Sequence, residues 1–244
     1  MLNAMQQRAV VTMNPAALIL AGSGTGKSSV LVARIQHLLE QGTPAKSIMA
    51  ISFTNKAANE IKQRLIRQMS QSINELWLGT FHSLCFKLLM MHCKEKCKVI
   101  SQSQQLSIIK TLIAELSIEF DAKKVLGFIN AKKDQGARAS ESDELFEQLY
   151  LAYEKHCEAQ SLMDFGEILL RTYELLNAHP ALLAHYQQQF DYVLVDECQD
   201  TNAIQFAFLK LLTLPKQNLF IVGDDDQSIY GFRGAVVENM TQFQ

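Results

Sequence analysis

The sequence predicts an α/β fold in which a parallel sheet is interrupted by an all-helical insertion. Three apolar runs, at residues 17–20, 192–195 and 219–222, each precede a polar loop and are typical of buried parallel strands. Amphipathic helical patterns alternate with strands over the first 90 residues, as in βαβ units. From about residue 88 to residue 186 helical periodicity replaces the strand pattern. One α/β domain that contains an insertion explains this order more simply than two domains in series.

The N-terminal segment alternates between the two periodicities. Apolar residues recur at helical spacing between Ser28 and Gln41, and Gly42 and Pro44 then end that helix. The flanking apolar runs are short and continuous, as buried strands are. We therefore expect a strand at 18–20, a helix at 28–41, a strand at 48–52, a helix at 56–70 and a strand at 76–78.

The middle of the chain carries helical patterns, and strands return after it. The apolar runs that begin at Tyr192 and Leu219 supply the last two strands. The predicted boundaries place the α/β domain at residues 1–88 and 187–244 and the helical insertion at residues 89–186. Within the insertion, helices are expected at 106–116, 122–132, 142–160 and 165–176.

Composition places the chain among ordinary globular proteins. Its 244 residues are 48% apolar and 20% charged, which is enough to bury a full α/β core. No apolar run approaches the roughly 18 residues of a membrane span, and residues 1–8 lack the order of a signal peptide. We therefore expect a cytoplasmic protein with no membrane partner. The net charge of −2 supplies no overall basic field, so any nucleic-acid strand must be held by local stacking and a few positioned cations.

The five cysteines form no paired CxxC motif. Cys93 and Cys97 lie one helical turn apart, and Cys85 is close to them in sequence. Reduced cytosolic thiols are the favoured interpretation, and a metal or cluster site is the alternative.

A phosphate-binding loop follows the first predicted strand and opens the first predicted helix. Its glycines let backbone N–H groups turn toward phosphate oxygens, and the helix N-terminus adds a favourable dipole. Lys27 is expected to reach the β- and γ-phosphates, and the Ser28 hydroxyl to ligate magnesium. The alternative is a glycine-rich turn with no ligand. The segment is Ala21-Gly22-Ser23-Gly24-Thr25-Gly26-Lys27-Ser28.

Two further polar clusters follow the later strands, at the strand ends where open α/β sheets bind ligands. Asp196 and Glu197 are consecutive acids at the end of a buried strand, where ionised groups are costly unless they have a function. Asp196 is suited to holding magnesium and Glu197 to accepting a proton from water, with helix capping by both as the alternative. Gln227, after three acids, is the candidate sensor of the γ-phosphate. The three clusters together predict a nucleoside-triphosphate motor.

Seven segments, in family order and spread over the whole chain, resemble the N-terminal half of the UvrD/Rep/PcrA-type superfamily 1A DNA helicases, above all the UvrD branch. The resemblance implies a RecA-like P-loop NTPase domain, called 1A, interrupted by a helical domain called 1B. It also implies ATP-driven 3′→5′ translocation on single-stranded DNA in repair or replication, with ATP and Mg²⁺ as cofactors. The segments are 2–6, 21–28, 53–58, 79–82, 164–165, 196–201 and 223–235.

The resemblance also implies roles for single residues. Gln6 matches the glutamine that reads the adenine edge. The family residues that carry out ATP hydrolysis are matched by Lys27, Ser28, Asp196, Glu197 and Gln227. Base–aromatic stacking is worth roughly 1–3 kcal/mol per base and tolerates any sequence. The implied partners are single-stranded DNA, single-strand/double-strand junctions and repair proteins. DNA contacts are implied for Phe53, Thr54, Asn55, Thr80, His82, Tyr230, Phe232 and Arg233.

Four positions depart from the family pattern. Ser29 stands where the family usually has an arginine that stacks on adenine, so weaker ATP binding and weaker adenine preference are expected. Phe232 replaces the usual tryptophan, so its ring should still stack on a base but over a smaller area. Cys198 replaces an aromatic residue, which we interpret as a packing change, and Ala21 replaces the first glycine of the loop.

The resemblance implies a second RecA-like domain, which carries an arginine finger and the tyrosine of the adenine clamp. That domain is not among these 244 residues. An arginine finger is worth roughly 10³–10⁵ in rate, so we expect this chain to hydrolyse ATP poorly, as part of a longer helicase. One alternative is the motor module of a RecB-like helicase-nuclease. Another is a P-loop regulatory NTPase without nucleic acid, which leaves residues 230–233 and the Phe53 loop unexplained.

Overall fold

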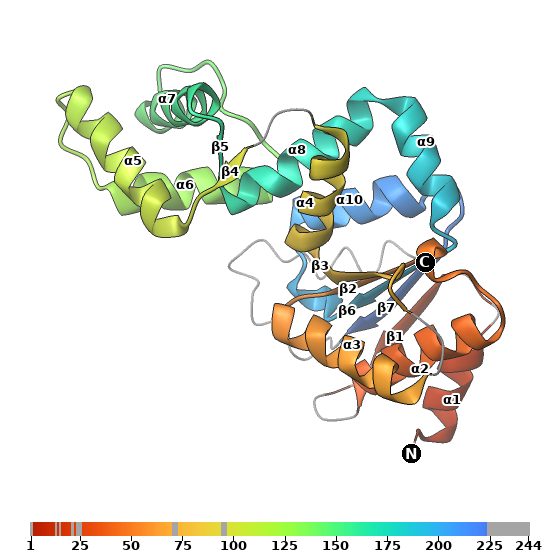
Figure 1. Ribbon diagram of the computed structural model, residues 1–244. Coiled ribbons are helices and arrows are strands. Elements are labelled where there is room, and N and C mark those ends of the chain that lie inside the picture. Colours follow the sequence, from red (N-terminus) through yellow and green to blue (C-terminus); the bar gives the residue numbers. More distant parts are fainter. Residues whose placement is uncertain are drawn as a thin grey trace. The chain divides into compact units, whose positions relative to one another are not determined.

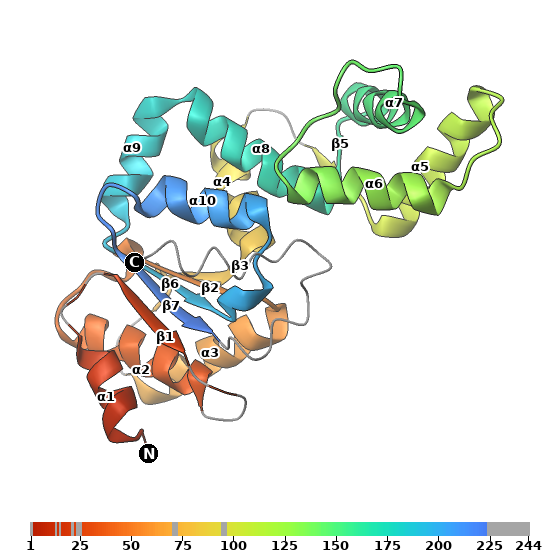
Figure 2. The same cartoon turned by 180° about the vertical axis from the view of Figure 1, so that it is seen from behind.

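The computed structural model describes residues 2–12, 14, 16–20, 22, 26–69, 73–93 and 97–223. The chain forms two compact units. The sheet unit comprises Met1–Leu84 and Leu176–Gln244, and the helical unit comprises Cys85–Leu175. Figures 1 and 2 show the elements of each unit from opposite sides.

A parallel sheet forms the centre of the sheet unit, which confirms the predicted α/β fold. Its described strands are β1 (Ala17–Leu20), β2 (Ile48–Ser52), β3 (Trp77–Thr80), β6 (Tyr192–Asp196) and β7 (Leu219–Gly223). They run in the order β1-β7-β6-β2-β3, and every pairing between them is parallel.

β1 differs from the expected fully buried strand. β2 and β7 are buried throughout, whereas β1 alternates and leaves Leu18 36% and Leu20 50% exposed. Among the described strands, β1 ends the order and pairs with β7 alone. An apolar run predicts a strand but not whether both of its faces are covered, because coverage depends on which elements pack there.

Helices flank the sheet on both sides. α1 (Ala4–Val11), α2 (Lys27–Glu40) and α3 (Asn55–Gln68) lie on one side, and α10 (Ala203–Thr213) lies on the other (Figures 1 and 2). The predicted helices at 28–41 and 56–70 correspond to α2 and α3. Four helices were not predicted: α1, α4 (Phe81–His92), α9 (Pro180–Gln189) and α10. Capping boxes start α1 and α10, and these short sequence signals would have revealed both helices.

The strand register brings the carboxyl ends of the strands to one edge of the sheet. Leu20 pairs with Gly223, Asp196 with Val222, and Ser52 with Thr80. The residues that directly follow β2, β3 and β6 therefore lie at the edge where open α/β sheets bind ligands. A core of apolar side chains fixes α1, α2 and α3 against this sheet, including Val30, Leu31, Ile35, Ile61, Leu194 and Phe220.

A buried cation joins α1 and α2 to the sheet. Arg34 on α2 is 4% exposed, and its Nη1 donates to the carbonyl oxygen of Val10 in α1 at 2.6 Å. Its guanidinium carbon lies 5.8 Å from the ring centre of Tyr192 and 5.6 Å from that of Phe220. Burial lowers the pKa of Arg34 below its ordinary value. These contacts fix the position of α1, the helix that carries Gln6.

The helical unit contains the four predicted helices and a strand pair that was not predicted. β4 (Lys98–Val99) and β5 (Leu162–Met163) pair in parallel, so the insertion is not entirely helical. Strands of two residues carry no periodicity that a sequence pattern can reveal. The predicted helices are α5 (Gln102–Glu115), α6 (Ala122–Asp134), α7 (Leu145–Ala159) and α8 (Phe165–Ala178), of which α8 begins in this unit. Most of α4 also belongs to this unit.

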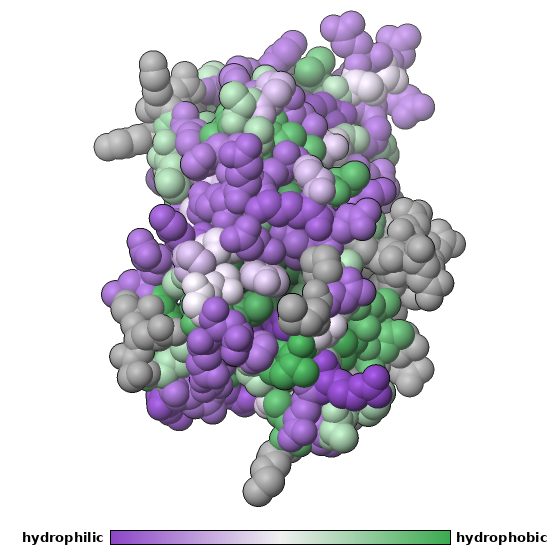
Figure 3. Space-filling view, turned by 90° about the vertical axis from the view of Figure 1, so that its right-hand side faces the viewer, coloured by the Kyte–Doolittle hydropathy of each residue, from purple (hydrophilic) through white to green (hydrophobic). Residues whose placement is uncertain are grey.

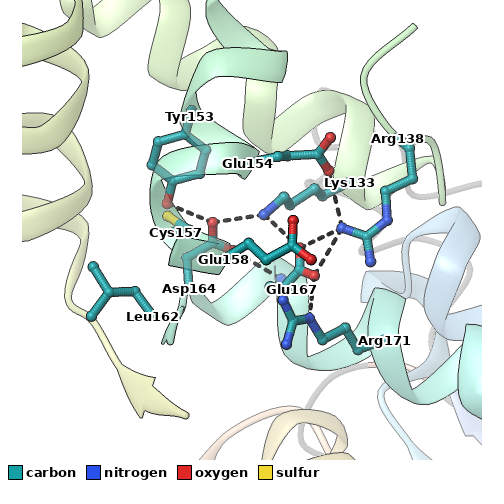
Figure 4. Close-up of a pocket in the computed structure, with 10 residues that line it drawn as sticks. All are labelled: Lys133, Arg138, Tyr153, Glu154, Cys157, Glu158, Leu162, Asp164, Glu167 and Arg171. Atoms are coloured by element: carbon teal, nitrogen blue, oxygen red, sulfur yellow. Dashed lines mark hydrogen bonds and ion pairs between the residues drawn. The ribbon is translucent and has the colours of Figure 1, made fainter. Parts of the chain in front are cut away.

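Buried charges join α6, α7 and α8. Lys133 Nζ lies 2.8 Å from Asp164 Oδ2 and 2.8 Å from Glu167 Oε2. Tyr153 donates its hydroxyl to Asp164 at 2.7 Å, while Arg138 and Arg171 converge on Glu167 (Figure 4). A cavity of about 260 Å³ adjoins these residues. Each of these charged side chains is paired with one of opposite charge. The cluster therefore needs no ligand to balance its charges, and its role is to hold α6, α7 and α8 together.

One face of the molecule can be judged from its hydropathy. Hydrophilic residues predominate on the face that Figure 3 shows, and apolar residues form scattered groups. The large apolar side chains that are more than half exposed include Met5, Val11, Met91, Phe165 and Leu214. In the described part of the chain, no helix combines the length and the apolar character needed to cross a bilayer.

Candidate functional site

The start of α2 carries part of the predicted phosphate loop. Gly22, Gly26, Lys27 and Ser28 belong to the described residues, and Ala21, Ser23, Gly24 and Thr25 lie outside them. Gly26 is the N-cap of α2 and has a φ of +88°, a left-handed conformation that favours glycine. Its carbonyl oxygen accepts hydrogen bonds from the N–H groups of the next turn. Gly26 thus turns the chain into α2 and places Lys27 at the helix N-terminus, where anions are favoured.

Two contacts join the start of α2 to the end of β6. Lys27 is 7% exposed, and its Nζ lies 3.4 Å from Glu197 Oε2. Ser28 donates its hydroxyl to Asp196 Oδ2 at 3.1 Å, across a separation of 168 residues in the sequence. The two consecutive acids therefore face different residues of α2, as their separate predicted roles require.

Asp196 combines burial with an oxygen that has no partner. The residue is 3% exposed, and its Oδ1 has no hydrogen-bond partner among the described residues. Burial and, after it, the charge of Glu197 raise the pKa of Asp196 to about 6, against the hydrogen bond from Ser28. A carboxylate oxygen beside a serine hydroxyl is a donor set of the kind that Mg²⁺ prefers. Ser28 and Asp196 therefore fit a magnesium ion.

Metal binding at this site does not require a cluster of protein ligands. Within the described residues, no group of three or more His, Cys, Asp or Glu side chains is arranged to hold a metal ion. Mg²⁺ in nucleotide sites is bound through one or two carboxylates together with phosphates and water. The five cysteines are free thiols, and Cys85, Cys157 and Cys198 are buried.

Glu197 has a backbone conformation that is rare for a residue with a side chain. Its φ is +54°, in the left-handed region, which costs roughly 1–2 kcal/mol. The side chain is 32% exposed, and its Oε2 accepts a hydrogen bond from the Gln199 amide in addition to the contact with Lys27. Backbone strain of this kind is concentrated at functional sites. Glu197 is thus held beside Lys27 while its carboxylate still reaches solvent.

Asp200 is a third acid of this site, and it was not predicted as a site residue. It ends the short 3₁₀ helix η2 (Cys198–Asp200), and its Oδ1 is buried without a hydrogen-bond partner among the described residues. Burial and then the charge of Glu197 raise the pKa of Asp200 to about 6, while Lys27 acts in the opposite direction. Its position four residues after Asp196 in the same polar loop was the available sequence signal.

A cavity of about 280 Å³ lies beside the start of α2, with Gln6, Gly26, Ser29 and Arg64 in its lining. We call it the Gln6 cavity. Gln6 Oε1 accepts a hydrogen bond from the backbone N–H of Asn3 at 2.8 Å, and Nε2 is 3.7 Å from the position that a Cβ on Gly26 would take. The predicted adenine-reading residue therefore lies next to Gly26 at the start of α2. The presence of Arg64 in this cavity was not predicted.

The residues predicted to contact DNA after β2 are at the carboxyl edge of the sheet. Phe53 is half-buried, and Thr54 and Asn55 are exposed. Thr54 is also the N-cap of α3, because its hydroxyl accepts a hydrogen bond from the N–H of Ala57 at 3.1 Å. One of the three residues thus has a structural role as well.

The two residues predicted to contact DNA at the end of β3 and the start of α4 differ in exposure. Thr80 is 7% exposed, and its hydroxyl accepts a hydrogen bond from the N–H of Ser83 at 3.3 Å. His82 is half-buried, and burial lowers the pKa of its imidazole below the ordinary value. Gln227, Tyr230, Phe232 and Arg233 lie outside the described residues, so their roles remain predictions.

Comparison with known proteins adds independent information. The model of the UvrD/REP helicase N-terminal domain matches residues 2–244. DNA helicase II of Escherichia coli (strain K12) is 39% identical over 258 residues, which cover 99% of this chain and 36% of that protein. The ATP-dependent DNA helicase PcrA of Bacillus subtilis (strain 168) is 35% identical over 260 residues, covering 100% of this chain and 35% of that protein. The chain thus spans about a third of the length of these curated relatives.

Proposed function

This chain belongs to the UvrD/REP helicase family, and on that premise we propose that it is the ATP-binding and single-stranded-DNA-binding N-terminal part of an ATP-dependent 3′→5′ DNA helicase. The observation that carries the proposal is the double contact between α2 and β6. Lys27 meets Glu197, and Ser28 meets Asp196. A lysine, a hydroxyl and two acids at the N-terminus of one helix are the side chains that phosphoryl transfer to water requires.

In the proposed reaction the triphosphate lies along the start of α2. Lys27 exchanges its contact with Glu197 for the β- and γ-phosphates, which leaves Glu197 able to accept a proton from the attacking water. Ser28 and Asp196 would hold Mg²⁺, which when bound neutralises charge on the phosphates. Gln227 is the proposed sensor of the γ-phosphate.

We assign the sheet unit to domain 1A of the family and the helical unit to domain 1B. Single-stranded DNA is proposed to cross the carboxyl edge of the sheet, where Phe53 supplies a ring for base stacking. The carboxyl ends of β2 and β3 lie side by side at the same edge of the sheet, which supports this path. The proposed contacts are those of Phe53, Thr54, Asn55, Thr80, His82, Tyr230, Phe232 and Arg233.

The test of this proposal is Mg²⁺-ATP turnover with and without single-stranded DNA. We expect slow turnover from the 244-residue chain and DNA-stimulated turnover from a longer chain that adds a second RecA-like domain, because an arginine finger is worth roughly 10³–10⁵ in rate. Glu197→Gln in the longer chain is the control, and it should abolish turnover while ATP still binds. Rapid ATP turnover by the 244-residue chain, at a rate that single-stranded DNA does not change, would contradict the proposal.

A further inference from the structure

We propose that the groove between α5 and α6 of the helical unit is a docking site for a partner protein, from which it takes a short segment with an apolar centre and acidic residues on either side. The inference concerns the helical unit alone and does not depend on the nucleotide site. α5 and α6 lie side by side in both views (Figures 1 and 2). The space between them has a volume of about 450 Å³, and we call it the α5–α6 groove.

The groove is open because one position of α6 has no side chain. Its α6 wall includes Lys123, Gly127 and Asn130, which are spaced by four and three residues and so share one face of the helix. A Cβ on Gly127 would meet nothing within 4 Å. Glycine is unfavourable inside a helix, and no close contact among the described residues requires it here. The open space is thus a feature of the surface and not a consequence of packing.

The floor of the groove is apolar. Leu126 is 7% exposed and belongs to the core of the helical unit, and Leu106 of α5 is half-buried against that core. Both residues line the groove. A partner's apolar side chain laid over Gly127 would cover them, which is favourable in proportion to the apolar area removed from water.

The rim of the groove favours a partner with negative charge. No Asp or Glu occurs among the described residues that line it. Lys123 is exposed at one end and forms no ion pair within the described part of the chain. At the other end, Asn130 uses its Oδ1 to accept from Gln105 at 3.2 Å, so its amide N–H groups are the part that can donate to a ligand. Carboxylates are the groups complementary to both ends.

The spacing of these two ends sets the length of the segment. Lys123 and Asn130 are seven residues apart on one helix, a distance of about 10 Å along its axis. An extended chain covers that distance in about three residues. We therefore expect two acidic residues about three positions apart, with apolar residues between them.

Nucleic acid fits this groove less well than a protein segment does. The described lining contains a single cation, Lys123, and no aromatic ring. Phosphate backbones are held by several lysines or arginines, and single strands by bases that stack on aromatic rings. A protein segment needs only the apolar floor and a few polar contacts.

Fluorescence anisotropy with a labelled peptide tests the inference. The probe is fluorescein-labelled Ser-Glu-Glu-Phe-Leu-Glu-Glu-Ser, titrated with the 244-residue chain, and we expect half-saturation below about 1 mM. Two control peptides, one with Ser-Ser in place of Phe-Leu and one with lysine in place of each glutamate, should not bind. Failure of the probe to bind the unmodified chain would overturn the inference, and so would equal binding of either control peptide.

Variants of α6 assign the binding to the groove. Gly127→Gln should weaken peptide binding about 10-fold or more, because its side chain fills the space for the apolar residue, and it should unfold at no lower denaturant concentration. Lys123→Gln should weaken binding about 2- to 5-fold. Lys124→Gln is the matched control, because Lys124 is an exposed neighbour that does not line the groove. Full peptide affinity in Gly127→Gln, or equal losses in the two lysine variants, would overturn the inference.

A fluorescein-labelled DNA duplex, titrated in the same way, tests the other class of occupant. Gly127→Gln and Lys123→Gln should change its affinity by less than about 2-fold, since a duplex is not expected in the groove. If the two variants weaken duplex binding as much as peptide binding, the groove is a DNA contact and the inference is overturned.

Discussion

Gln6 illustrates how one side chain serves structure and recognition together. Its Oε1 accepts from the N–H of Asn3, and the Asn3 side chain accepts in return from the N–H of Gln6 at 2.9 Å. This capping box starts α1 and holds the residue at the rim of the Gln6 cavity. The side-chain amide nitrogen is the group on the Gly26 side. A substitution at Gln6 therefore has two effects that can be separated by the choice of variant.

The variant Gln6→Glu should keep the capping box and lose the amide donor. We expect stability close to that of the unmodified chain and a weaker preference for ATP over GTP, because carboxylate and amide oxygens both accept from Asn3. Gln6→Ala should lose the preference and also about 0.5–1.5 kcal/mol of stability, the usual net contribution of one hydrogen bond, because only the bond from the Asn3 N–H is lost. Urea unfolding and competition between the two nucleotides measure the two effects. Unchanged nucleotide preference in both variants would remove Gln6 from base recognition.

At the scale of elements, the crossing of α6 and α8 depends on the absence of a side chain. A Cβ on Gly166 would lie 3.0 Å from Lys133 Cβ and 3.1 Å from Lys133 Cδ. Lys133 cannot move aside easily, since it is 2% exposed and paired with Asp164 and Glu167. Gly127, on α6 itself, would meet nothing within 4 Å. Two glycines in neighbouring helices of one unit thus have opposite surroundings.

Substitution of these two glycines by alanine should change stability in opposite directions. Gly166→Ala is expected to lower the free energy of unfolding by about 1–2 kcal/mol, because overpacking outweighs the gain in helix propensity. Gly127→Ala is expected to raise it by about 0.5–1 kcal/mol, since alanine restricts the unfolded chain and no clash opposes it. Denaturant unfolding of both variants is the measurement. A Gly166→Ala variant as stable as the Gly127→Ala variant would show that the crossing tolerates a methyl group.

At the scale of the whole molecule, the two units rely on different interactions. The proposed nucleotide and DNA residues all belong to the sheet unit, whereas the cluster around Lys133 belongs to the helical unit. Burial alone would raise the pKa of Glu167, but the charges of Lys133 and Arg138 outweigh it and lower that pKa to about 2. Burial likewise opposes the charged form of Lys133, and the charges of Asp164 and Glu167 overcome it, so its pKa is raised. Glu167 and Lys133 are therefore both charged at neutral pH.

Acid should destabilise the helical unit through Glu167. The pKa of this carboxyl is about 2 in the folded chain against an ordinary value of 4.5, so the unfolded chain takes up the proton first as the pH falls. The contribution to stability is complete above about pH 4.5 and is lost between pH 4.5 and pH 2. Hydrogen exchange of α6, α7 and α8 across this range is the measurement. Glu167→Gln should be less stable at neutral pH and show a shallower loss in acid, and an unchanged slope would exclude Glu167 as the cause.

Local sequence patterns were sufficient for the elements and motifs that consist of neighbouring residues. Continuous apolar runs predicted the five described strands of the sheet, and helical spacing predicted α2, α3 and the four helices of the helical unit. The glycine loop and the acids after β6 were recognisable from consecutive residues alone. The β4–β5 pair and the exposed face of β1 were missed, because two residues make no pattern and apolar character does not state what covers a strand.

The sequence by itself therefore determined the α/β class, the family and the residues that form the phosphate loop and the acid pair. Only the tertiary structure decided which of them meet: Lys27 with Glu197, Ser28 with Asp196, and Arg64 with Ser29. The tertiary structure also revealed that Asp200 belongs to the site and that Lys133 lies between the carboxylates of Asp164 and Glu167. The physical reason is that a strand or a loop is encoded by neighbours in the chain. A contact between distant residues depends on the strand order and on the packing of helices against the sheet.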